Sequence, residues 1–139
     1  MLVREAMETR VVTVEPGQSI AEAARRMRDS GTGFIPVVVG SRVVGVVTDR
    51  DIVVRFVADG GEDARSMPVS EIMTSTITVV GPDDDLADAA ETMRSAGIRR
   101  LAVVEGGHLA GVLSHGVLVQ ATACEGAGRL ATLGVTQGA

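Results

Sequence analysis

The sequence predicts an α+β fold made of two tandem copies of one unit, each running strand, helix, strand, strand, helix. The segment from Val3 to Ala58 aligns without a gap on the segment from Val69 to Cys124, at a constant offset of 66 residues. An ungapped match of this length indicates a duplication. Within each copy, one apolar stripe has the period of an amphipathic helix. Two short apolar runs follow, separated by a two-residue, glycine-containing turn that is typical of a hairpin.

The domain organisation follows from the length and the duplication. A chain of 139 residues can bury one substantial core but is too short for two independent domains of ordinary size. We expect the first copy at residues 3–58, a polar linker at 59–68, the second copy at 69–124 and a loosely ordered tail at 125–139. Because one copy would be only marginally stable by itself, the two copies are predicted to share a core.

The first helix of each copy carries start and stop signals. Ser19 and Glu22 have the spacing of a capping box, and the aspartates at 83–85 place negative charge at the start of the second copy's helix. Gly31 and Gly97 stand where a C-terminal helix stop belongs. The residues expected on the buried stripes are Ile20, Ala23, Ala24 and Met27 in the first copy and Leu86, Ala89, Ala90 and Met93 in the second.

A hairpin and a closing helix complete each copy. A brief strand ending at Pro16 or Pro82 precedes the first helix. The hairpin strands are expected at Phe34–Val39 and Arg42–Thr48, and at Leu101–Glu105 and His108–Ser114. The closing helices are expected from Asp49 to about Ala58 and from about His115 to Cys124.

The closing helices are apolar on more than one face. Apolar residues surround most of the first one, although a single face is enough to cover the hairpin of its own copy. These residues are Ile52, Val53, Val54, Phe56 and Val57, with Val117, Leu118, Val119, Ala121 and Ala123 in the second copy. Monomers seldom tolerate an exposed apolar patch of this kind, so we predict a twofold homodimer.

Composition argues against several classes of partner. The net charge of -5 and the pI near 5.0 do not suit a protein that binds phosphate backbones, so nucleic acid is not expected as a partner. No apolar run reaches the 18 residues of a membrane span, and the N-terminus lacks a signal-peptide pattern. The single cysteine, Cys124, cannot form an intramolecular disulfide. A cytoplasmic protein without membrane contact is the expectation.

Nothing in the sequence indicates a catalytic or metal site. His108 and His115 have no cysteine or second carboxylate at metal-ligand spacing. Ser114 and His115 are sequence neighbours that need not pair as nucleophile and base, and no Gly-x-Ser-x-Gly elbow is present. We therefore expect a protein that is not an enzyme and holds no metal.

The repeated unit resembles the CBS domain, and two such units in tandem resemble a Bateman module. The resemblance rests on the openings "AMET" and "IMTS", the run "GFIPVV" and the stretch "TDRDIVVR", and it covers nearly all of residues 3–124. Short stand-alone bacterial pairs, including the hypoxic-response type, are the most similar kind. The resemblance implies a regulatory module in which two repeats pack with pseudo-twofold symmetry around clefts that hold adenosine compounds.

The nucleotide signature of the family is present in the first copy, at Gly45, Thr48 and Asp51. The resemblance implies that the Asp51 carboxylate accepts hydrogen bonds from ribose hydroxyls while the Thr48 hydroxyl suits a phosphate. A structural interpretation stays open, because Thr48 and Asp51 also have the spacing of a helix cap. The second copy keeps the hydroxyl at Ser114 but has Val117 in place of the carboxylate, so we expect at most one good nucleoside site per chain.

The resemblance extends the candidate site to further positions. Pro36 cannot donate a backbone hydrogen bond, so recognition through backbone groups falls to Gly33, Phe34 and Ile35. The Phe34 ring either lies against adenine or belongs to the core or to an interface. The candidate adenine contacts are Arg10, Val11, Val12, Gly33, Phe34, Ile35 and Pro36, and the candidate phosphate contacts are Arg50, Arg99 and Arg100. Because all 13 basic residues are arginine, each of these arginines is equally well explained as a surface residue.

Two functions of different classes remain. The first is a ligand-sensing regulatory module that binds an adenosine compound (AMP, ADP, ATP, an NAD-type molecule or S-adenosylmethionine) and acts on its own dimer or on a regulated protein that the sequence does not identify. The second is a ligand-free interaction or dimerisation module with vestigial nucleotide sites. Thr48 and Asp51 favour the first, and Val117 favours the second.

Overall fold

Two compact units make up the protein. The computed structural model describes residues 1–125, with side chains for residues 1–121, so most of the expected tail at 125–139 lies outside the described residues. The β1–β2 unit comprises Val11–Ile77 and Gly107–Leu109. The β4–β5 unit comprises Met1–Arg10, Thr78–Gly106 and the chain from Ala110. Among the described residues no helix is long and apolar enough to cross a membrane.

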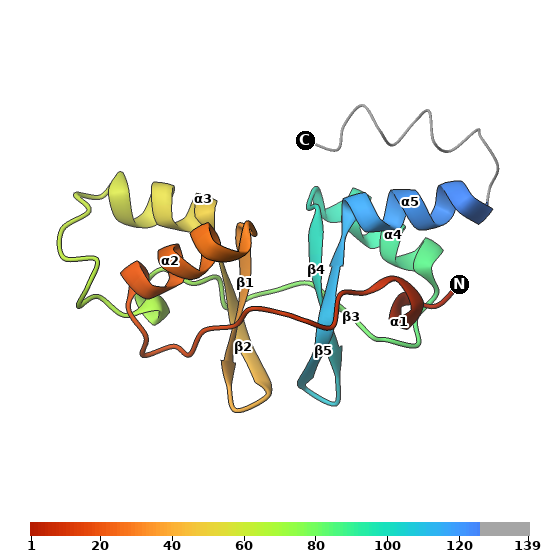
Figure 1. Cartoon of the computed structure of the whole chain (residues 1–139), viewed down its shortest axis with the longest axis horizontal. Coiled ribbons are helices and arrows are strands. Elements are labelled where there is room, and N and C mark those ends of the chain that lie inside the picture. The colour runs from red at the N-terminus through yellow and green to blue at the C-terminus, as the bar shows by residue number, and fades with distance from the viewer. Residues whose placement is uncertain (126–139) are drawn as a thin grey trace. The chain divides into compact units, whose positions relative to one another are not determined.

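The β1–β2 unit is built on an antiparallel hairpin (Figure 1). Strands β1 (Phe34–Val39) and β2 (Arg42–Thr48) have the bounds that the sequence predicts. Helix α2 (Ile20–Ser30) packs against β1. After β2 come the short helix α3 (Asp49–Asp51) and the π-helix η1 (Ile52–Val57). The 3-10 helix η2 (Val69–Glu71) lies in the segment that follows.

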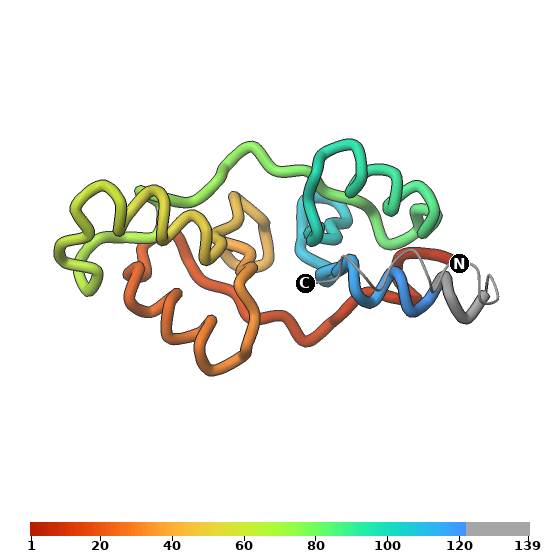
Figure 2. Tube along the Cα trace, turned by 90° about the horizontal axis from the view of Figure 1, so that it is seen from above, coloured from red at the N-terminus to blue at the C-terminus, as the bar shows by residue number. Residues whose placement is uncertain are grey.

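The β4–β5 unit repeats this arrangement with the second copy. Its strands are β3 (Val79–Val80), β4 (Arg100–Glu105) and β5 (His108–Ser114), and β3 pairs with β4 in parallel. Helices α4 (Leu86–Ala96) and α5 (His115–Glu125) complete it, together with α1 (Val3–Ala6) from the start of the chain. Helix α1 contacts both α4 and α5, as the red segment beside α5 shows in Figure 2.

The two structural units do not coincide with the two sequence copies. The first residues of each copy pack in the unit that contains most of the other copy. We call residues 1–10 the N-terminal strap and residues 69–77 the central strap. The Val69 amide donates to the Gln18 carbonyl at 2.7 Å, and the Val3 amide donates to the Asp84 carbonyl at 2.9 Å. These pairs are equivalent under the 66-residue offset, so the exchange follows the internal repeat.

One glycine in each hairpin leaves room for the backbone of a strap: the central strap in the β1–β2 unit and the N-terminal strap in the β4–β5 unit. The Val46 amide donates to the Thr74 carbonyl at 2.9 Å, and the Glu8 amide donates to the Val112 carbonyl at 2.8 Å. A Cβ atom at Gly45 would lie 2.7 Å from the carbonyl oxygen of Thr74, and one at Gly111 would lie 2.5 Å from that of Glu8. Both contacts are too short for any side chain, so these glycines are required for the close approach of the strap.

The expectation of a single shared core is wrong, because the described residues form two separate apolar clusters, one in each unit. Each cluster nevertheless contains residues of both copies. Val3 is fully buried against the second copy, while Val69 and Ile72 are buried against the first. A single copy of about 56 residues has little apolar area to bury, so the exchanged straps supply part of each core.

The predicted caps of the first helices are present, with one correction. The Ser19 hydroxyl oxygen accepts a hydrogen bond from the Glu22 amide at 3.1 Å. The Glu22 carboxylate binds Arg25 and Arg26 in place of the Ser19 amide, so the capping box is only half formed. The two helix-ending glycines have the left-handed conformation expected of them, with φ of 79° at position 31 and 67° at position 97.

The closing helix of the first copy differs from the expected α-helix. Only Asp49–Asp51 are α-helical, and the Ala58 amide donates to the Val53 carbonyl, five residues back, at 2.9 Å. A run of β-branched residues, Ile52, Val53 and Val54, has restricted side chains and a low preference for a regular α-helix. The amphipathic pattern alone did not reveal this change of helix type.

One further expectation needs correction. Ala24, expected on the buried stripe of α2, is exposed, because the core takes up only Ile20 and Ala23 completely. The segment expected as a linker, residues 59–68, lies against the β1–β2 unit, since the Ala21 amide donates to the Ala64 carbonyl at 2.8 Å. Ala64 and Met67 pack against the core of that unit.

Candidate functional site

The junction between β2 and α3 places the two principal candidate residues. Thr48 has an extended backbone, and its hydroxyl oxygen accepts a hydrogen bond from the Asp51 amide at 3.1 Å. The Asp51 Oδ2 atom accepts one from the Thr48 amide at 2.9 Å. The two side chains therefore form a reciprocal capping box, which is the structural role that the sequence left open.

Asp51 has partners beyond the cap. It is 8% exposed and is the one buried charged residue among positions 1–121. The Thr74 hydroxyl lies 3.4 Å from Oδ1 and 3.5 Å from Oδ2 of Asp51. The Arg55 Nε atom lies 3.7 Å from Oδ1. A buried carboxylate needs such partners to offset its desolvation. We call Thr48, Asp51, Arg55 and Thr74 the Asp51 cluster.

The two oxygens of Asp51 are used differently. Oδ2 accepts a hydrogen bond of ordinary length from the Thr48 amide. The contacts of Oδ1, at 3.4 and 3.7 Å, are longer than the 2.5–3.2 Å of well-formed hydrogen bonds. A carboxylate offers about four acceptor positions. Oδ1 can therefore still accept short hydrogen bonds from a ligand hydroxyl while Oδ2 caps the helix.

The start of β1 lies beside this junction. Phe34 is the register partner of Thr48, and the Asp49 amide donates to the Gly33 carbonyl at 3.0 Å. A Cβ atom at Gly33 would lie 2.4 Å from Asp49 Oδ2, so a larger residue there would displace the Asp49 side chain. Phe34 is half-buried. The structure thus brings Gly33 and Phe34 next to Thr48.

The other predicted contacts in this unit are less directly placed. Ile35 and Pro36 are buried in β1, and the Pro36 carbonyl accepts a hydrogen bond from the Val14 amide at 3.1 Å. Val11 and Val12 are half-buried. Arg50 is exposed next to the cluster, and its amide donates to Asp49 Oδ1 at 2.8 Å.

Three predicted arginines, Arg10, Arg99 and Arg100, belong to the β4–β5 unit. All three are exposed. The Arg99 carbonyl accepts a hydrogen bond from the His115 amide at 2.8 Å, which is equivalent to the bond between Gly33 and Asp49 in the first copy. Their role at a ligand phosphate stays a prediction.

The β4–β5 unit lacks an equivalent of the Asp51 cluster. The Ser114 hydroxyl oxygen accepts a hydrogen bond from the Val117 amide at 3.2 Å, so the hydroxyl half of the cap is kept. At the 66-residue offset, Val117 replaces Asp51, Ala121 replaces Arg55, and Glu8 replaces Thr74. The polar partners are therefore lost together. Our sequence reasoning identified Val117 but missed Arg55 and Thr74, although the same alignment pairs both with residues of different chemistry.

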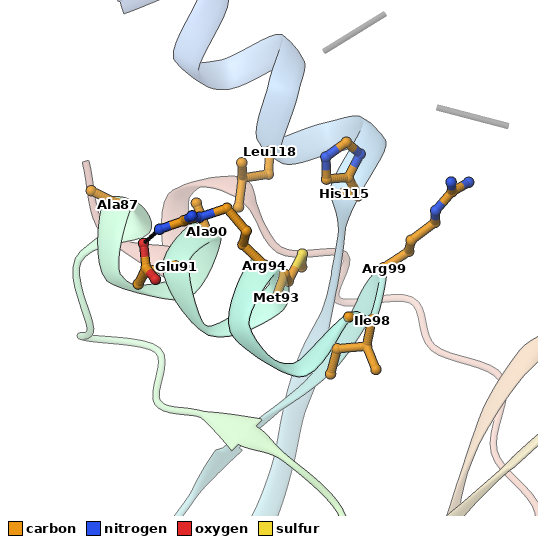
Figure 3. Close-up of a pocket in the computed structure, with 10 residues that line it drawn as sticks. Ala87, Ala90, Glu91, Met93, Arg94, Ile98, Arg99, His115 and Leu118 are labelled. Carbon is orange, nitrogen blue, oxygen red and sulfur yellow. Dashed lines mark hydrogen bonds and ion pairs between the residues drawn. The ribbon is translucent and has the colours of Figure 1, made fainter. Parts of the chain in front are cut away.

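A cavity of about 510 Å³ in the β4–β5 unit was not predicted (Figure 3). It lies between α4 and α5, and the His115 Nδ1 atom there is buried without a hydrogen-bond partner among the described residues. Glu91 and Arg94 form an ion pair at its edge, and the hydrogen bond from Arg94 lowers the pKa of the Glu91 carboxyl from its ordinary value. Arg99 extends away from this pair.

Comparison with known proteins identifies the repeats. The model of the family described as "CBS domain" matches residues 3–58 and 69–123. The chain belongs to the CBS-domain family. It is 40% identical over 116 residues to the CBS domain-containing protein YhcV of Bacillus subtilis, which covers 84% of this chain and 81% of that protein. The predicted tandem CBS pair is confirmed.

Two solved structures extend the comparison. Hypoxic Response Protein I, solved with two coordinated zinc ions, has a TM-score of 0.77 at 24% identity, covering 87% of this chain and 98% of that one, which shows a common fold. CBSX2 in complex with AMP has a TM-score of 0.78 at 27% identity, covering 90% of this chain and 98% of that one. Among the described residues of this chain, no group of three or more His, Cys, Asp or Glu side chains is placed to hold a metal ion.

Proposed function

We propose that this CBS pair is a regulatory module without a catalytic site of its own, acting in the cytoplasm, which binds an adenosine nucleotide through Asp51 in the β1–β2 unit. The observation that carries the proposal is the Asp51 carboxylate, which is buried and engaged in a cap through Oδ2 but receives no short hydrogen bond at Oδ1 from the described residues. The AMP complex of CBSX2 supports an adenosine nucleotide as the class of ligand.

The chemistry of the site suits a ribose. The two adjacent ribose hydroxyls are donors, and hydrogen bonds to an ionised carboxylate are shorter and stronger than neutral ones. The adjoining Gly33 and Phe34 would face the base, and the exposed Arg50 would reach the phosphate. AMP, ADP, ATP, NAD-type molecules and S-adenosylmethionine all carry such a ribose, so the ligand is sought among them.

The proposal is tested by measuring ligand binding to the intact chain. A nucleotide present at 100 times its dissociation constant should stabilise the fold by about 2.7 kcal/mol, which a thermal-shift screen of these compounds detects. Calorimetry with the best ligand should then give one site per chain, because Val117 replaces the carboxylate in the second copy. If none of these compounds stabilises the protein, the proposed function is wrong.

A second candidate function is favoured by the surface of η1. Val53, Val54 and Val57 are 58%, 46% and 58% exposed, while Phe56 of the same segment is buried. We propose that this ridge, which we call the valine ridge, contacts a second copy in a homodimer. If no adenosine compound binds but the dimer forms, the protein is an interaction module and the cap is the only role of Asp51.

A further inference from the structure

We propose that Thr74 and Arg55 are positioning residues that fix the Asp51 carboxylate for a ribose, so that the nucleoside site of the first copy is completed by the strap that begins the second. This inference rests on the proposed function. Neither residue belongs to the signature Gly45, Thr48 and Asp51 from which the site was predicted.

The position of Thr74 is set by the backbone. Its amide donates to the Val46 carbonyl at 2.8 Å, and its carbonyl accepts from the Val46 amide at 2.9 Å. The absence of a side chain at Gly45 allows this close approach. The paired backbone holds the Thr74 hydroxyl between the two Asp51 oxygens, at 3.4 and 3.5 Å.

Arg55 connects the same carboxylate to the strap. Its guanidinium donates to the carbonyl oxygens of Ile72 and Met73, each at 3.3 Å, and its Nε lies 3.7 Å from Asp51 Oδ1. The planar guanidinium has five donors in a fixed arrangement, so it can bind the strap and face the carboxylate at once.

The lengths of these contacts determine what they do. Thr74 and Arg55 lie at distances where hydrogen bonds are weak, so they orient the carboxylate without using the acceptor positions of Oδ1. Oδ2 is held by the Thr48 amide. The carboxylate is thus fixed on several sides and keeps one oxygen available for the ligand.

The second copy provides an independent comparison within the same chain. Where the carboxylate is replaced by Val117, both partners are replaced as well, by Ala121 and Glu8. The hydroxyl half of the cap is kept in that copy through Ser114, so this half of the cap does not require Thr74 and Arg55. Thr74 and Arg55 are thus present where the carboxylate is present and replaced where it is replaced, which is what we expect of positioning residues.

The test compares AMP with 2′,3′-dideoxy-AMP, which lacks the ribose hydroxyls, on the full chain. We expect Thr74→Val to weaken AMP binding about 3- to 10-fold, the effect of one net hydrogen bond, and to leave the affinity for the dideoxy compound unchanged. Thr74→Ser should restore AMP binding. The matched control is Thr76→Val, the same substitution at an exposed position of the same strap.

Arg55→Gln provides a second variant that should fold, because the Arg55 side chain is half exposed. This substitution too should weaken the binding of AMP and leave the affinity for the dideoxy compound unchanged. Unchanged AMP affinity in both folded variants, or an equal loss for both ligands, would overturn the inference. If AMP binding is lost in Asp51→Ala but kept in these variants, the proposed function stands and only the positioning role fails. If the wild type binds none of the adenosine compounds named above, both the proposed function and the positioning role fail.

Discussion

The geometry of Asp51 is compatible with both of the roles that the sequence presented as alternatives. Its Oδ2 completes a reciprocal cap with Thr48, and its Oδ1 remains available for short hydrogen bonds. The geometry of a carboxylate permits both roles, because its two oxygens can serve different donors. The cap at Asp51 is therefore no argument against a ligand-binding role for the same residue. A substitution of Asp51 should lower both the stability of the fold and the affinity for the ligand.

We predict that Asp51→Ala weakens binding of the adenosine ligand by about 10-fold to 150-fold, the effect of losing 1.5 to 3 kcal/mol of hydrogen bonding to a charged group. The substitution should also lower the free energy of unfolding by about 0.5–2 kcal/mol, because the Thr48 amide loses its acceptor and only the hydroxyl half of the capping box remains. Calorimetry and chemical denaturation measure the two effects separately.

The control for this prediction is Ser19→Ala, which removes the cap of α2 in the same unit. It should cost a comparable amount of stability and leave ligand affinity unchanged. If the affinity falls equally in both variants, the loss in Asp51→Ala comes from a weakened fold and the assignment of the ribose acceptor is wrong.

A second residue-scale prediction concerns the strap glycines. We expect Gly45→Ala and Gly111→Ala each to lower the free energy of unfolding by about 1–3 kcal/mol, since the new methyl group would overlap the carbonyl of Thr74 or Glu8. Gly17→Ala is the matched control, because open space surrounds that position, and it should be neutral or slightly stabilising. Equal stability of all three variants in urea denaturation would show that the straps move aside at no cost.

The elements that the sequence predicted best are those governed by local signals. The bounds of β1, β2 and β5 agree with the expected strands, because apolar runs separated by glycine-containing turns specify a hairpin through short-range interactions. Both helix-ending glycines have the expected left-handed conformation for the same reason.

The elements that could not be predicted depend on contacts between distant segments. The exchange of the straps is fixed by backbone hydrogen bonds such as Val69 to Gln18, and no local pattern in residues 69–77 indicates which copy they join. Thr74 reaches Asp51 only through this exchange, so it was missed as a site residue. The π-helical segment η1 was not predicted either, and it includes Phe56, which is buried in the core of the β1–β2 unit.

At the scale of the whole molecule, the exchange makes the two copies interdependent. Each apolar cluster includes buried residues from the other copy, Val3 in one and Val69 and Ile72 in the other. A single copy cut at the repeat boundary would lose the strap that completes its own core. The duplicated pair, and not one repeat, is therefore the smallest stable unit that we expect of this sequence.

The valine ridge is a surface that this pair leaves uncovered among its described residues. In the second copy the corresponding apolar residues are better covered, with Leu118 buried and Val117 and Val119 half-buried, while the side chain of Ala123 lies outside the described residues. The dimer contact was predicted from the closing helices of both copies. We now expect it at η1 alone, where Val53, Val54 and Val57 are exposed together. A closed twofold arrangement in which a ridge meets its own copy would bury all three at once.

We predict that the wild-type protein is a dimer at micromolar concentration and that Val54→Asp or Val57→Asp shifts it towards the monomer of 14.3 kDa. A charge in the centre of an apolar contact has no partner and must be desolvated, which weakens association strongly. Light scattering coupled to size-exclusion chromatography measures the mass. Val39→Asp is the control, because Val39 is 55% exposed in the same unit but lies outside η1, and it should leave the dimer intact. A wild-type mass of one chain, or dimers that persist in both ridge variants, would show that this ridge does not form the interface.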